Sequence, residues 1–106
     1  MIQNNINMSY RPLPIYLTIK PSNINGLGVF ATDDIDENHV LGITHVFNPN
    51  YQDGYIRTPL GGFFNHSDTP NCVIVDEGDF LILKTISKIN IGEEITAKYT
   101  LYNPEK

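Results

Sequence analysis

The apolar residues of this chain fall into short alternating runs, and nowhere does an apolar stripe with the roughly 3.6-residue period of a helix last for three turns. Such alternation is typical of strands that bury one face, and it leaves room only for short helical turns. The sequence therefore predicts a mainly β fold. Its 106 residues are enough for one domain with a single modest core.

The strand signals are separated by turn-forming residues. Strands are predicted at residues 15–20, 28–31, 40–46, 55–57, 72–75 and 80–84, and extended backbone at 94–99. The stretches 72–75 and 80–84 should pair as a hairpin, because Gly78 between them can adopt a positive φ. Residues 1–12 show no periodicity, so we expect a flexible N-terminal segment there and a single domain over residues 13–106.

Charge and cysteine content exclude several classes of protein. Twelve acidic and seven basic residues give a net charge of -5, the wrong sign for holding nucleic acid by its phosphates, so a basic partner suits the chain better. Cys72 is the only cysteine, which excludes an intramolecular disulfide and a cysteine-rich zinc cluster and fits a reducing compartment. We find no apolar run of about 18 residues and no secretion signal, and therefore expect a cytoplasmic protein without membrane or direct nucleic-acid partners.

Three clusters are candidates for chemistry, and the first is Gly26-Leu27-Gly28. Such a pattern lets backbone approach a ligand closely, and its N–H groups suit an anionic or carboxylate group. It is equally typical of a tight turn. The third glycine and the following helix of a dinucleotide-binding fingerprint are missing, so that class of site is not indicated.

The second cluster is residues 61–72, which read GGFFNHSDTPNC. Its glycines permit unusual dihedrals, its phenylalanines supply apolar bulk, and Pro70 fixes the exit, so it suits a buried irregular crossing better than a surface loop. The Asn65 amide can donate and accept at once, either for a polar ligand or for the backbone of a turn. His66 is suited to acting as a base or ligand, or to a structural hydrogen bond. It shares no metal-ligand spacing with His39 and His45, so we expect no metal site.

The third cluster, residues 92–99, reads GEEITAKY. The Tyr99 hydroxyl can orient an amine, although Tyr99 would also serve as a packed strand residue. Glu93 and Glu94 are adjacent and so lie on opposite faces of a strand, which makes them an unconvincing acid–base pair. No Ser-His-Asp or Cys-His arrangement is indicated anywhere in the sequence.

Taken in order, the segments GLGVFA (26–31), GFFNHSDTPN (62–71) and GEEITAKY (92–99) resemble the SET-domain lysine methyltransferases over about residues 15–102. The resemblance implies a SET-domain, β-clip-like fold, in which small β-sheets surround a C-terminal pseudoknot. It implies S-adenosyl-L-methionine as the cofactor, in a pocket lined by the backbone of Gly26, Leu27 and Gly28 and by Asn65 and His66. Tyr99 matches the catalytic tyrosine of the family, at the inner end of a channel that admits the target lysine.

The chemistry of such an enzyme requires few catalytic groups. A sulfonium is already a good leaving group, so methyl transfer requires a neutral amine aligned behind the methyl carbon, and neither a metal nor a covalent nucleophile is necessary. Phe47, Tyr51 and Tyr55 are candidates for lining the lysine channel. Ala97 occupies a position where members of the family often have a bulky residue that controls how many methyl groups fit.

The sequence also departs from the family. Asp68 stands where many members carry a zinc-binding cysteine, and no cysteine follows Tyr99, so we expect no zinc-bearing C-terminal module. The chain resembles minimal viral or bacterial members, some of which complete their site by forming a homodimer. The preferred interpretation is a protein-lysine methyltransferase that acts on a basic protein or peptide tail. Its alternatives are a non-catalytic SET-like module that binds a peptide or the cofactor, and a small β domain whose pocket serves another molecule.

Overall fold

The computed structural model describes residues 13–51 and 54–98. The flexible segment expected over residues 1–12 and the predicted catalytic Tyr99 lie outside these ranges. Within them the chain forms eight short strands and one short helix, which confirms the mainly β prediction. The prediction of at most short helical turns is also confirmed, because this helix has only five residues.

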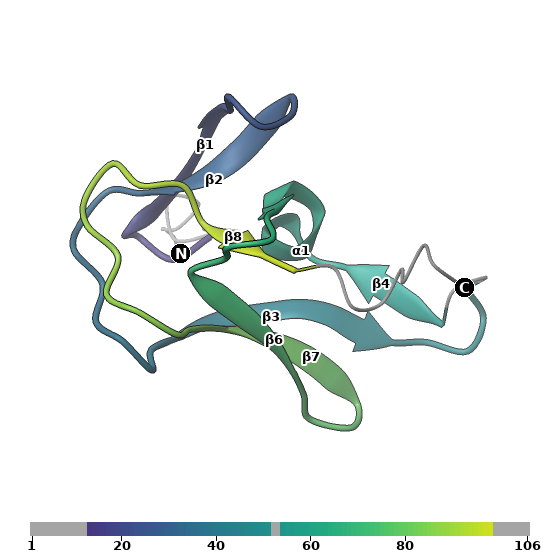
Figure 1. Ribbon diagram of the computed structural model, residues 1–106. Helices are drawn as coiled ribbons and strands as arrows, with labels where there is room; N and C mark the ends of the chain where they lie inside the picture. The colour runs from purple at the N-terminus through teal and green to yellow at the C-terminus, as the bar shows by residue number, and fades with distance from the viewer. Residues whose placement is uncertain (1–12, 52–53, 99–106) are drawn as a thin grey trace, which may run out of the picture.

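A small two-stranded sheet is formed by β1 (Leu17–Pro21) and β2 (Leu27–Ala31), which pair antiparallel. It lies apart from the larger sheet, at the top of Figure 1. The first strand begins two residues later than predicted, because Ile15 and Tyr16 form a turn closed by a 3.0 Å hydrogen bond from the Leu17 N–H to the Pro14 carbonyl. Pro21 is the last residue of β1, a strand end where its missing N–H is tolerated.

The larger sheet has six strands in the order β4-β3-β7-β6-β8-β5. The first four pair antiparallel with their neighbours, whereas β8 is parallel to both β6 and β5. The hairpin of β6 and β7 is as predicted, and Gly78 in its turn has a φ of 93°. The strands are β3 (Val40–Phe47), β4 (Tyr55–Arg57), β5 (Asn65–His66), β6 (Cys72–Asp76), β7 (Phe80–Thr85) and β8 (Thr96–Ala97).

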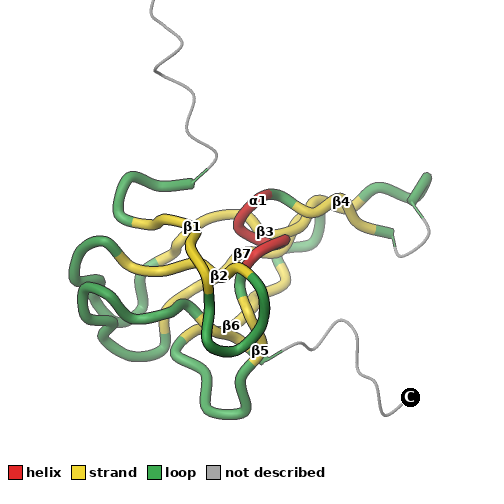
Figure 2. Tube along the Cα trace, turned by 90° about the horizontal axis from the view of Figure 1, so that it is seen from above, coloured by secondary structure: helices red, strands yellow, loops and turns green. Residues whose placement is uncertain are grey.

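The one helix in the described ranges, α1 (Pro59–Phe63), lies against β3 (Figure 2). Thr58 caps it, because its hydroxyl oxygen accepts the Gly61 N–H at 3.2 Å. The two glycines of this helix do not use the left-handed region that glycine permits, since neither has a positive φ. Gly61 is instead required for close approach, because a Cβ there would lie 2.8 Å from the Thr44 carbonyl carbon, whereas one at Gly62 would meet open space.

The core joins the two sheets. Its largest fully buried aliphatic side chains come from β2, β3, β7 and the segment between β7 and β8: Val29, Leu41, Leu83, Ile89 and Ile95. That last segment runs beside the chain that follows β2 on the left of Figure 1, and Ile35 and Ile89 form a β-bridge there. Its end also pairs with β2, where the Ile95 N–H donates to the Val29 carbonyl at 2.7 Å. The approach to β8 is therefore fixed against the small sheet.

Candidate functional site

Asn65, the first residue of β5, is the centre of a polar cluster between the two sheets. Its side chain is only 7% exposed. The carboxamide nitrogen Nδ2 lies 2.7 Å from Glu94 Oε2, 3.1 Å from Ser22 Oγ, and 3.2 and 3.3 Å from the carbonyl oxygens of Asn25 and Leu27. Carbonyl and carboxylate oxygens only accept hydrogen bonds, so the amide must present its NH2 group to them. Asn65 thereby ties the larger sheet to the turn between β1 and β2.

That turn contains the Gly26-Leu27-Gly28 segment. Gly26 has a φ of 44° and so occupies the left-handed region that favours glycine. Gly28 is crowded: a Cβ on it would clash with the Glu94 carboxylate, 3.0 Å from Cδ, and would lie 3.1 Å from Asn65 Nδ2. The structure therefore brings the first predicted motif and Asn65 together. Their part in binding a cofactor stays a prediction.

Two residues of this cluster were missed by sequence reasoning. The Ser22 hydroxyl donates to the Glu94 carboxylate, with both carboxylate oxygens at 2.8 Å, and its oxygen accepts the Ile24 N–H at 2.9 Å. Glu94 was considered only as half of an acid–base pair with its neighbour and set aside. The one signal for Ser22 is its suitability for a hydroxyl-bonded turn before the glycines. Nothing local in the sequence pairs it with a residue 72 positions away.

His66 lies on the outer part of the site. It pairs with Ala97 in the parallel ladder of β5 and β8. Its Nε2 lies 3.2 Å from the carboxylate of Asp68, and the two side chains are 40% and 85% exposed. Asp68, which stands at the family's cysteine position, is thus a partner of His66, and such an exposed pair contributes little stability.

Asn71 connects the second motif to the third. Its Nδ2 donates to the Glu94 carbonyl at 2.8 Å, and its Oδ1 accepts the Thr96 N–H at 2.9 Å. One side chain thus takes the place of a strand partner for the backbone at Glu94 and at Thr96, the first residue of β8. Ala97, fully buried on β8, is placed by this contact. Tyr99 follows two residues later, outside the described residues, so its catalytic role and the pseudoknot stay predictions.

The candidate channel residues lie around the hairpin of β3 and β4. Phe47 and Tyr55 are paired in register, with ring centroids 6.1 Å apart in an edge-on arrangement. Tyr51 is 53% exposed in the loop that joins the two strands. Tyr55 also lies edge-on to the ring of the buried His45, with centroids 5.8 Å apart. A channel lined by Phe47, Tyr51 and Tyr55 stays a prediction.

Two other reactive groups are buried and unsuited to catalysis. Burial raises the pKa of the Cys72 thiol from 9.0 to about 12, so the group stays neutral at physiological pH. His45 is 1% exposed, and its Nδ1 lies 2.8 Å from the hydroxyl of Thr44. Within residues 13–51 and 54–98, no three His, Cys, Asp or Glu side chains converge as metal ligands would, and no helix is long and apolar enough to cross a membrane.

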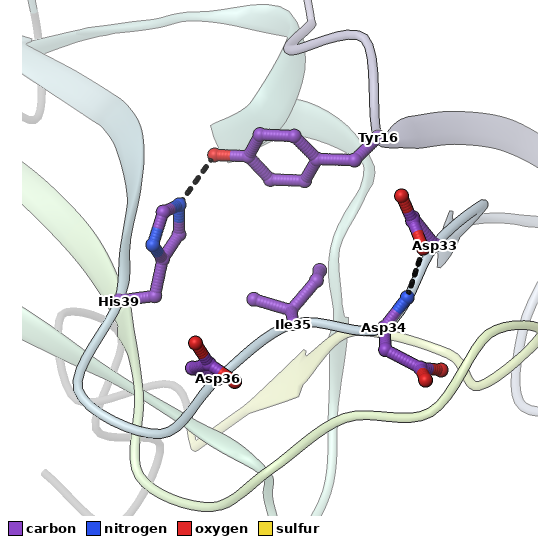
Figure 3. A pocket seen from close by; sticks show the side chains of 6 residues that line it. All are labelled: Tyr16, Asp33, Asp34, Ile35, Asp36 and His39. Atoms are coloured by element: carbon purple, nitrogen blue, oxygen red, sulfur yellow. Dashed lines mark hydrogen bonds between the residues drawn. The ribbon is translucent and has the colours of Figure 1, made fainter.

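A hollow of about 160 Å³ lies elsewhere, between the turn before β1 and the segment that follows β2 (Figure 3). The Tyr16 hydroxyl and His39 Nε2 are hydrogen bonded across it at 2.8 Å, and burial raises the pKa of Tyr16. None of the predicted site residues lines it. Its lining is Tyr16, Asp33, Asp34, Ile35, Asp36 and His39.

Comparisons with known proteins agree with this architecture. The model of the SET domain family matches residues 43–100. A SET domain-containing protein of Acanthamoeba polyphaga mimivirus, L678, is 27% identical over 84 residues, which cover 76% of this chain and 33% of that protein. The chain thus spans about a third of the length of this curated relative.

Solved structures of the same fold include three informative neighbours. PFL0690c of Plasmodium falciparum, a candidate histone methyltransferase, superposes with a TM-score of 0.66 at 24% identity, over 79% of this chain and 92% of that one. The methyltransferase domain of human PR domain-containing protein 2 gives 0.60 at 19% identity, over 80% and 77%. Polycomb Repressive Complex 2 of Chaetomium thermophilum, bound to S-adenosylmethionine, gives 0.63 at 18% identity, over 79% and 15%.

These structural likenesses show the fold, and the family model matches more than half of the sequence. The chain belongs to the SET domain family.

Proposed function

We propose that this chain is an S-adenosyl-L-methionine-dependent protein-lysine N-methyltransferase. The observation that carries the proposal is the set of hydrogen bonds from the Asn65 amide to the carbonyls of Asn25 and Leu27, which joins two motifs about 40 residues apart. A turn whose backbone carbonyls are hydrogen bonded to a buried side chain is held in one conformation, and it can therefore present a rigid binding surface. Neighbours of the same fold that are named methyltransferases support the assignment.

The chemistry of the cluster fits the cofactor. S-adenosyl-L-methionine carries a positive sulfonium and a positive ammonium group. The Glu94 carboxylate and the carbonyls of Asn25 and Leu27, which accept from Asn65, make the cluster electronegative and so favourable to these positive groups. We infer that the backbone of residues 26–28 and the side chains of Asn65 and His66 hold the cofactor, which supplies a methyl group on a good leaving group.

The remaining chemistry falls to the residues around the amine. Tyr99 would orient the lysine nitrogen, and an apolar channel would lower the lysine pKa by desolvation, so that the amine arrives neutral. Phe47, Tyr51 and Tyr55 are the proposed channel lining. Ala97 is buried two residues before Tyr99, and its small side chain would leave space for more than one methyl group on the lysine nitrogen.

We propose a lysine-containing basic protein or peptide tail as the substrate. The net charge of -5 favours a basic partner, and the name of the Plasmodium neighbour is consistent with histone-like substrates. We further propose that residues 13–106 form a single minimal SET domain that acts in the cytoplasm of a host cell, as the mimivirus relative suggests. A homodimer would complete the lysine channel, and sedimentation that shows only monomer at assay concentration would contradict it.

The test has two steps. Calorimetric titration with S-adenosyl-L-methionine should give saturable binding to the wild-type protein and at least a tenfold weaker affinity for Asn65→Ala, the loss expected when about 1.5 kcal/mol of hydrogen bonding is removed. A library of basic peptides with radiolabelled cofactor should then acquire methyl groups with the wild type and not with Tyr99→Phe. Binding without any methylated peptide would support the non-catalytic SET-like module instead. A folded protein that binds no cofactor would refute the proposal.

A further inference from the structure

We propose that Glu94 is a positioning residue of the cofactor site, whose carboxylate fixes the Asn65 carboxamide so that Oδ1 accepts from the ammonium group of S-adenosyl-L-methionine. This inference rests on the proposed function. It concerns a residue that touches Asn65 and acts through it.

The carboxylate of Glu94 is firmly held. The single Ser22 hydroxyl proton is shared between the two carboxylate oxygens, both 2.8 Å from Oγ, and the 2.7 Å distance to Glu94 is the shortest from Asn65 Nδ2 to its four acceptors. The backbone is fixed as well, because the Glu94 carbonyl accepts from Asn71 and the residue bridges to Phe30 on β2. Hydrogen bonds to a carboxylate are roughly twice as strong as those between neutral groups. Glu94 is therefore the dominant partner of the Asn65 amide.

This contact decides which end of Asn65 faces a ligand. The nitrogen and oxygen of a carboxamide lie on opposite arms of one plane, so directing Nδ2 at Glu94 directs Oδ1 away from it. Within the part of the chain that the structure describes, no group donates to Oδ1. That oxygen is thus available to an N–H donor such as an ammonium group. If the amide flipped, it would set its oxygen against a carboxylate and present an NH2 group to a cation.

Gly28 is explained by the same arrangement. A side chain there would clash with the Glu94 carboxylate and lie 3.1 Å from Asn65 Nδ2. The second glycine of the Gly-x-Gly segment therefore makes room for the positioning carboxylate, whatever else it does for the cofactor. Replacing Gly28 by alanine should weaken cofactor binding by displacing the Glu94 carboxylate, and this gives the inference a second, independent test.

The first test compares two ligands. Wild type, Glu94→Ala and Glu94→Gln are titrated with S-adenosyl-L-methionine and with 5′-methylthioadenosine, an uncharged thioether that keeps the adenosine and sulfur but lacks the chain that carries the ammonium and carboxylate groups. Glu94→Ala should weaken S-adenosyl-L-methionine about 10-fold to 100-fold, the loss of a hydrogen bond to a charged group. It should weaken 5′-methylthioadenosine by less than about twofold. Glu94→Gln should fall between, because its amide oxygen still accepts from Asn65 without the charge.

The control is Glu93→Gln, which removes the same charge one residue away while retaining an acceptor for the Asn90 N–H. It should bind both ligands as the wild type does. If Glu94→Ala and Glu94→Gln each lose equal affinity for both ligands, the pocket has collapsed generally and the inference is overturned. If these variants bind S-adenosyl-L-methionine as tightly as the wild type does, the inference is overturned and the proposed function is not. A wild type that binds neither ligand would instead refute the proposed function.

The second test is a double-mutant cycle on Gly28→Ala and Glu94→Ala. If Gly28 makes room for the carboxylate, the affinity lost in Gly28→Ala should shrink several-fold in the Glu94→Ala background. If Gly28 is needed only for direct approach of the cofactor, the loss will be the same in both backgrounds, and the inference fails. An amide NMR spectrum of each variant checks that it is folded, and the Asn65 side-chain NH2 signals should shift in Glu94→Ala and not in Glu93→Gln.

Discussion

Adjacent glycines in α1 should respond to the same substitution in opposite directions. At Gly61 an added Cβ would clash with the Thr44 carbonyl oxygen and lie 2.8 Å from its carbon and 3.0 Å from Thr44 Cα. These are backbone atoms of Thr44, a fully buried residue of β3, so the helix itself must shift. At Gly62 the added Cβ would meet no atom within 4 Å, and the residue is exposed.

The magnitudes follow from these contacts. Forced repacking against backbone costs about 1–3 kcal/mol, so Gly61→Ala should lower the free energy of unfolding by that amount. Gly62→Ala should leave it unchanged or raise it by about 0.5–1 kcal/mol, because alanine loses less conformational entropy in a helix. Urea unfolding followed by circular dichroism measures both variants against the wild type. A Gly61→Ala protein as stable as Gly62→Ala would refute the close packing of α1 on β3.

Three further predictions concern single side chains. Burial raises the pKa of Cys72 from 9.0 to about 12, so the thiol of the unfolded chain ionises at a lower pH than that of the folded protein. The free energy of unfolding should therefore fall as pH rises from 9 towards 12, by up to ~1.4 kcal/mol per pH unit more in wild type than in Cys72→Ala. Urea unfolding of both proteins at about pH 8 and about pH 10.5 measures this difference. Asn71→Ala should cost about 1–3 kcal/mol by leaving backbone groups of residues 94–96 unpaired, whereas exposed Asn50→Ala should change stability by less than about 0.5 kcal/mol in the same assay. Thr58→Ala should lower the free energy of unfolding by about 1 kcal/mol through loss of the helix cap, and Thr58→Ser, which keeps the capping hydroxyl, should leave it close to the wild-type value.

The local elements were predictable because their signals are local. Strand β4 has the predicted bounds, and the hairpin of β6 and β7 was indicated by two alternating runs around a glycine turn. The helix α1 was not predicted at its position, because five residues with two glycines are too few to show a helical period. Its stability comes from the Thr58 cap and from packing on β3, which no local pattern encodes.

The candidate site was only half predictable. The motifs around Gly26 and Asn65 were recognised by resemblance, and the structure brings them within hydrogen-bonding distance. The carboxylate that holds them was missed, since its partners are 72 and 29 positions away and its own neighbourhood suggested only a charged strand residue. The crowding of Gly28 by the side chains of Glu94 and Asn65 could not be predicted either, because no local pattern places these side chains beside it.

We propose above that the cluster around Asn65 and the Gly-x-Gly turn binds S-adenosyl-L-methionine. The most direct measurement is an NMR titration of the isotope-labelled protein, which reports binding residue by residue. We expect saturable shifts of the backbone amides of Gly26, Gly28 and His66 and of the Asn65 side chain. No shifts in a folded protein, or shifts confined to the hollow around Tyr16 and His39, would contradict it.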